Sequence, residues 1–140
     1  MIRGALGAAA AVALAVVLAG NVAVAEQGPI RLTTKPGVAV KVRNHVKLDG
    51  GCAGSAPVIE FSPGPVHGKI EIRPDRFVYQ SGYVSGSLLA CVGRPVDGVA
   101  IWYTPDPGFH GVERFTWTVS FGGGSHSHRM DTHSAQITVE

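Results

Sequence analysis

The chain has 140 residues, with 12 Lys and Arg, 10 Asp and Glu, and a formal net charge of +2 at pH 7. This length predicts one domain, and the balanced charge argues against a nucleic-acid binder, which would carry a concentrated basic footprint. One local basic stretch is formed by Arg31, Lys35, Lys41, Arg43 and Lys47. We interpret it as the solvated face of an edge strand, and the alternative is a contact with an anionic surface.

Residues 1–25 have the marks of a secretory signal peptide. Arg3 precedes an Ala/Val/Leu run, and the run ends in Ala23-Val24-Ala25, a small-x-small cleavage site. The alternative is a retained membrane anchor, because this run is long enough to span a bilayer. Cleavage after Ala25 would leave no stable anchor and predicts a periplasmic or secreted protein.

Two cysteines, Cys52 and Cys91, are the full complement of the chain. In an exported chain an even number of cysteines predicts a disulfide, and only one pairing within the chain is open to these two. Closing a loop of roughly 40 residues stabilises a domain by about 4 kcal/mol in the chain-entropy treatment. The spacing excludes a C-x-x-C redox motif.

The mature chain alternates apolar and polar residues with a period of two, which is typical of β-strands with one buried face. After an N-terminal extension at residues 26–35, the segment 36–140 is predicted to form one domain. Its turns are rich in Gly, Pro and Asp; Pro74-Asp75 is one predicted turn, and residues 82–98 are a predicted long connection fastened by the disulfide. The apolar sets, in chain order, are Val38/Val40/Val42, Ile59/Phe61, Ile70/Ile72, Phe77/Tyr79, Val99/Ile101/Tyr103, Phe115/Trp117/Val119 and Ala135/Ile137/Val139.

The stretch "YTPDPGFHGVERFTWTV", residues 103–119, is predicted to be a tight corner followed by a strand. Pro105 and Pro107 restrict the backbone to extended or turn geometry, and Gly108 and Gly111 are expected to supply the backbone freedom that a tight corner needs. Phe109 is expected to pack under the corner and Tyr103 to be buried. We interpret this stretch as scaffold.

Tyr103, Pro105, Gly108, Phe109 and Gly111, followed by alternating aromatic and Thr residues, resemble the corner of bacterial Ig-like or cadherin-like modules. "HGKIEI" (67–72) and "AQITVE" (135–140) resemble neighbouring strands of such modules. The resemblance implies an all-β, Ig-like antiparallel β-sandwich of about seven strands with a structural or adhesive role. This chain differs in being a single copy with a cysteine pair and in lacking the clustered acidic motifs that bind calcium, so it resembles a small secreted form.

The segment Ser125–His133 gathers side chains that ligate metals. Alternate residues of an extended chain point the same way, so His126 and His128 could share one ion, with His133 or Asp131 completing the site. Imidazole and carboxylate suit Zn²⁺, and the thioether of Met130 would favour Cu⁺. The alternative is a solvated loop. His45, His67 and His110 are predicted to be surface or turn residues.

No catalytic motif is present in the sequence, so we expect no enzymatic activity. Trp102 is predicted to lie on the opposite face from Ile101 and Tyr103, where it is either a binding handle or covered by a loop. The sequence therefore predicts a non-catalytic exported protein with a structural or binding role in the cell envelope, whose partner is an envelope protein or a glycan. The alternatives are a periplasmic transition-metal binder and a small enzyme with an unrecognised site.

Overall fold

The computed structural model describes residues 28–80, 86–121 and 130–140, and this part of the chain is built from β-strands and one short 3₁₀ helix. The predicted all-β class is therefore confirmed. The elements are β1 (Ile30–Thr34), β2 (Val40–His45), β3 (Lys47–Leu48), β4 (Gly54–Ser55), β5 (Val58–Phe61), β6 (Gly68–Val78), η1 (Gly86–Cys91), β7 (Pro95–Pro105), β8 (Gly111–Ser120) and β9 (Met130–Val139).

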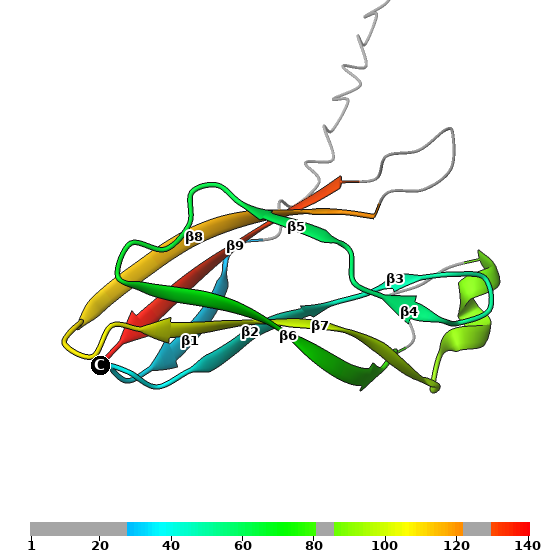
Figure 1. The fold of residues 1–140 in the computed structure, drawn as a ribbon, viewed down its shortest axis with the longest axis horizontal. Helices are drawn as coiled ribbons and strands as arrows, with labels where there is room; N and C mark the ends of the chain where they lie inside the picture. The colour runs from blue at the N-terminus through cyan, green and yellow to red at the C-terminus, as the bar shows by residue number, and fades with distance from the viewer. Residues whose placement is uncertain (1–27, 81–85, 122–129) are drawn as a thin grey trace, which may run out of the picture.

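Two sheets pack face to face as a β-sandwich (Figure 1). One has the strand order β1-β9-β8-β5 and the other the order β2-β7-β6, so that together they hold seven strands of the described chain. The pair β1–β9 is parallel and the other pairs within the two sheets are antiparallel. The parallel strand β1 lies within residues 26–35, a segment predicted to be an N-terminal extension that precedes the domain.

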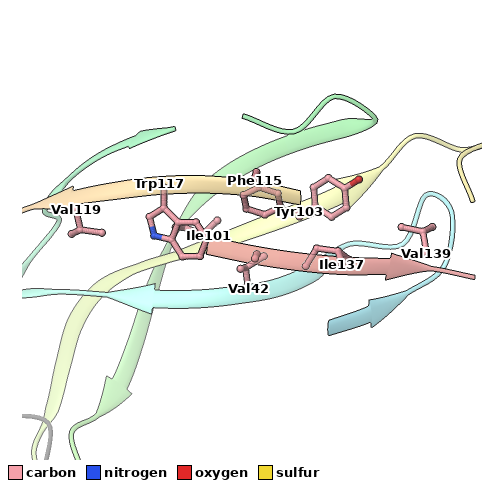
Figure 2. Close-up of a cluster of buried hydrophobic side chains, with 9 residues drawn as sticks. Val42, Ile101, Tyr103, Phe115, Trp117, Val119, Ile137 and Val139 are labelled. Atoms are coloured by element: carbon pink, nitrogen blue, oxygen red, sulfur yellow. The ribbon is translucent and has the colours of Figure 1, made fainter. Parts of the chain in front are cut away.

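The core lies between the inner faces of the two sheets (Figure 2). Aromatic and β-branched residues at every second position point inward, because successive side chains of a strand alternate between its faces. Trp117 and Tyr103 are fully buried and are the largest side chains in the core. The buried cluster consists of Val42, Ile101, Tyr103, Phe115, Trp117, Val119, Ala135, Ile137 and Val139.

Two predicted boundaries are wrong. Pro74-Asp75 is not a turn, because β6 runs without a break from Gly68 to Val78. Proline is tolerated there because β6 is an edge strand, whose outer row of backbone groups needs no N–H donor. The predicted connection at residues 82–98 is also shorter than expected, since η1 and the start of β7 occupy much of it.

The corner between β7 and β8 is held by a buried carboxylate. Glu113 is 3% exposed and accepts hydrogen bonds from the backbone N–H groups of Val66 and His67, at 3.2 and 2.7 Å. The Tyr103 hydroxyl lies 3.3 Å from the same carboxylate and 3.1 Å from the carbonyl oxygen of His67. Of the two glycines expected to supply backbone freedom here, Gly111 has a φ of 141°, whereas Gly108 has no positive φ. These hydrogen bonds hold the corner together, which supports the interpretation of its residues as scaffold.

The opposite end of the sandwich is closed by the predicted disulfide. Cys52 and Cys91 are bonded, with their Cα atoms 5.4 Å apart, and Cys91 is fully buried. The bond ties the β3–β4 hairpin to the end of η1 (Figure 1). The predicted signal peptide, residues 1–25, lies outside the described residues. Within the described ranges, no helix is long and apolar enough to cross a membrane.

Candidate functional site

One end of the sandwich, beside the β8–β9 connection, carries polar side chains at positions that continue the core. On β9 the inner-face residues Val139, Ile137 and Ala135 are at most 2% exposed. Alternation along the same strand then places His133 and Asp131 on the inner face. We call the group formed by His45, Trp117, Asp131 and His133 the histidine end.

His45 is the last residue of β2 and is 7% exposed. Its Nε2 accepts a hydrogen bond of 2.9 Å from the indole Nε1–H of Trp117. Because Nε2 is the acceptor, the proton of the neutral imidazole lies on Nδ1. The bond also supplies an acceptor to a buried tryptophan N–H, which would otherwise be left without one.

The prediction that His45 is a surface or turn residue is wrong, and a β-bulge is the reason. Continuing the spacing of Val40 and Val42 would point Asn44 inward and His45 outward. The register of β2 on β7 shifts between Lys41 and Arg43; pairing resumes with Arg43 opposite Ile101 and continues to His45 opposite Val99. An extra residue in a strand reverses the faces of all residues that follow it. His45 therefore faces the core.

His133 completes a set of three neighbouring rings. It lies directly opposite Trp117 in the β8–β9 ladder, and the two ring centroids are 5.5 Å apart. The centroid of His133 is 5.1 Å from that of His45, which belongs to the other sheet. One predicted ligand, His133, therefore lies beside His45, a histidine that was not among the predicted ligands.

Both imidazoles of the histidine end are held in the neutral form. Burial, followed by the charges of His133 and Arg43, lowers the pKa of His45 from 6.5 to about 4, and the charge of Asp131 opposes this shift. Burial and Arg43 also lower the pKa of His133. A neutral imidazole ligates transition metals through its one unprotonated nitrogen. In His45 that nitrogen already accepts the indole N–H of Trp117, so His133 is the candidate ligand of this pair.

The described residues supply only part of a metal site. No group of three or more His, Cys, Asp or Glu suited to a metal ion occurs within residues 28–80, 86–121 and 130–140. Of the four predicted ligands, His133 and Asp131 are described, and both are on β9. His126 and His128 lie outside the described residues. The histidine end therefore offers the imidazole of His133 and the carboxylate of Asp131 as ligands, because the acceptor nitrogen of His45 is bonded to Trp117, and a closed coordination sphere would need further ligands.

Trp102 lies on the outer face of the β2-β7-β6 sheet, as predicted. It is half-buried, whereas its neighbours Ile101 and Tyr103 are fully buried. The Trp102 ring is covered by a side chain of the adjacent strand and not by the expected loop. The guanidinium of Arg73 lies 4.7 Å from the centroid of the Trp102 ring. Arg73 is in turn fixed by hydrogen bonds to Glu71. This cation–π contact occupies a ring face that a sugar would need for stacking.

No protein-family model, no curated protein and no solved structure matches the chain. The functional argument therefore rests on the residues of this chain alone.

Proposed function

We propose that this chain is an exported, non-catalytic, Ig-like β-sandwich protein with a structural or binding role in the cell envelope. The observation that carries the proposal is the Cys52–Cys91 bond, because structural disulfides form and persist in oxidising compartments. The signal-peptide pattern of residues 1–25 supports the same compartment independently. The corner Tyr103–Gly111 and the two-sheet sandwich support the Ig-like type.

Export is tested by expressing the full chain and separating cytoplasmic, periplasmic and extracellular fractions. We expect the protein in an exported fraction, with Glu26 as its first residue and without free thiols by mass spectrometry. A chain that keeps residues 1–25 and reduced Cys52 and Cys91 in the cytoplasm would contradict the proposal.

The binding role is tested by capture from an envelope extract with the purified oxidised protein, with and without a chelator. A partner retained in both conditions supports an envelope protein or glycan as the ligand. Capture that depends on metal supports the second candidate below. A protein that retains no component of the extract in either condition would favour a purely structural role.

The second candidate function is transition-metal binding at the histidine end. It is favoured by the position of His133 on the inner face of β9, with a lowered pKa and the charge of Asp131 nearby. His126 and His128 belong to the chain segment that joins β8 to β9 and are the proposed additional ligands. Two or three imidazoles with a carboxylate suit Zn²⁺ or Cu²⁺.

Calorimetry with Zn²⁺ and with Cu²⁺ tests this second function. We expect binding to weaken in His133→Ala and in the double variant His126→Ala/His128→Ala, and to persist in the control His110→Gln, which removes an exposed histidine. Equal binding by the parent and by both ligand variants would exclude this site.

A further inference from the structure

The outer face of the β1-β9-β8-β5 sheet carries two rows of polar side chains that run across the strands. In the first row Gln136 of β9 is paired with Arg31 of β1 on one side and with Arg114 of β8 on the other. Arg31 and Arg114 are exposed. Neighbouring strands lie about 4.8 Å apart, so the two arginines start roughly 10 Å from each other.

The second row is two residues along the strands and carries hydroxyl groups. Ser134 of β9 is paired with Thr116 of β8. Thr116 exchanges backbone hydrogen bonds with the segment Ser62–Pro63, since its N–H donates to the carbonyl oxygen of Pro63 at 3.0 Å. At the other edge Pro29 precedes Ile30, which is paired with Ala135. A proline therefore stands at each end of the hydroxyl row.

A shallow groove of about 210 Å³ lies between these rows. Pro29 and Pro63 line its ends, Arg114 and Gln136 line one side, and Thr116 and Ser134 line the other. Its floor is the backbone at Phe115 and Ala135, whose side chains are buried in the core. The groove is therefore open to solvent, crosses the strands, and has apolar ends and polar sides.

The two arginines have no carboxylate partner within the described part of the chain. Arg114 donates from Nε to the amide oxygen of Gln136 at 3.2 Å, which leaves its terminal nitrogens available. The outward acid of this sheet, Glu60, lies opposite Thr118, one row beyond the hydroxyls. By contrast, three cations of the other sheet are paired with carboxylates: Lys41 with Asp75, Arg73 with Glu71, and Arg76 with Asp97.

We propose that this groove binds a short acidic oligosaccharide, an inference that rests on the binding role proposed above. Each guanidinium of Arg31 and Arg114 binds an anionic group of the sugar chain through paired N–H donors. The hydroxyls of Thr116 and Ser134 exchange hydrogen bonds with sugar hydroxyls. The prolines at the ends contact the apolar C–H faces of the rings. The separation of the arginines suits acidic groups on separate sugar units of one chain.

Other polyanions fit this face less well. A single-stranded nucleic acid would need exposed aromatic rings on which its bases stack, and the ring of Phe115 below the groove is buried. An extended acidic peptide binds best along a free strand edge, where its backbone can pair. This groove lies across the middle of the sheet, where the backbone groups of β8 and β9 are already paired with each other.

The test is an amide NMR titration of the purified oxidised protein with trigalacturonate. Methyl-esterified trigalacturonate is the uncharged probe of the same shape, and hexaglutamate is the acidic peptide probe. We expect the amide signals of Arg114, Thr116, Ser134 and Gln136 to shift, with binding at least about tenfold tighter for trigalacturonate than for either other probe. Equal binding of the ester or of hexaglutamate would overturn the proposal, as would shifts confined to another face.

Matched variants separate specific contacts from net charge. Arg31→Gln/Arg114→Gln removes one positive charge that lines the groove and one beside it, and Lys35→Gln/Lys47→Gln removes two exposed positive charges elsewhere. We expect the groove variant to weaken trigalacturonate binding at least about tenfold and the control to stay within about twofold. An equal loss of affinity in both variants would show that binding depends only on net charge, and it would overturn the proposal.

The outcome of the trigalacturonate titration does not depend on whether the protein is exported. Failure of the exported, oxidised protein to bind trigalacturonate at millimolar concentration would refute the groove and leave the proposed compartment intact. Binding by a chain that cells retain in the cytoplasm would refute the compartment and leave the groove intact.

Discussion

The His45–Trp117 hydrogen bond should make the fold sensitive to mild acid. Protonating His45 turns Nε2 into a donor, so the ring can no longer accept the indole N–H of Trp117. Burial, then the charges of His133 and Arg43, lower the pKa of His45 from 6.5 to about 4 in the folded chain. The unfolded chain binds this proton more readily, so the free energy of unfolding must decrease as the pH falls from about 6.5 toward 4.

The size of the effect follows from the two pKa values. Between about pH 7.5 and about pH 5, a histidine with a pKa of 6.5 when unfolded and about 4 when folded removes roughly 2 kcal/mol of stability. Below that range carboxylates also protonate, so we restrict the comparison to this interval. The lowered pKa of His133 acts in the same direction. A loss of this size is a large part of the 5–15 kcal/mol stability typical of a domain.

Urea unfolding at these two pH values, followed by tryptophan fluorescence with a chelator present, measures the difference. His45→Gln provides the decisive comparison, because its amide oxygen can accept the indole N–H and cannot titrate. We expect His45→Gln to lose most of the pH dependence, and His110→Gln, which removes an exposed histidine, to keep it. A parental pH dependence in His45→Gln would refute the reasoning.

Three further predictions concern the scaffold and are read from the same unfolding curves. Glu113→Leu should lower stability by about 2–5 kcal/mol, because the part-buried backbone N–H groups of Val66 and His67 lose their acceptor and the Tyr103 hydroxyl keeps only the carbonyl oxygen of His67; a loss below about 1 kcal/mol would contradict this. Cys52→Ser should lower stability by about 2–5 kcal/mol, and an unchanged denaturation midpoint would show that the disulfide adds nothing. Gly111→Val should destabilise more than Gly108→Val, because only Gly111 has a positive φ, 141°, and its Cβ would approach the ring of Phe109; equal effects would remove this explanation.

The elements that could be predicted from the sequence are those encoded by local alternation and residue chemistry. The all-β class, the buried Tyr103 and the Cys52–Cys91 bond are of this kind, because each depends on a short pattern or on a single possible pairing. The Ig-like type stays a prediction.

The elements that could not be predicted depend on neighbours that are distant in sequence. Pro74 can continue a strand because β6 is at a sheet edge, and the edge is a property of the whole sheet. The inward direction of the His45 side chain depends on a β-bulge that the residue types of β2 do not predict. The groove beside Arg114 forms only when β1, β9 and β8 are placed side by side. A polar residue near the end of an apolar alternation, such as His45 after Val42, is the one signal that could have drawn attention to the histidine end.

The parallel pairing of β1 with β9 has a mechanical consequence. The ladder runs from Ile30 beside Ala135 to Thr34 beside Val139, and the N–H of Glu140 extends it with a 3.0 Å bond to the carbonyl oxygen of Thr34. Because the two strands point the same way, tension between the start of β1 and the end of β9 acts along the ladder in opposite directions. The hydrogen bonds of the ladder would then carry the load together in shear, and the sandwich would resist extension until they yield as a group.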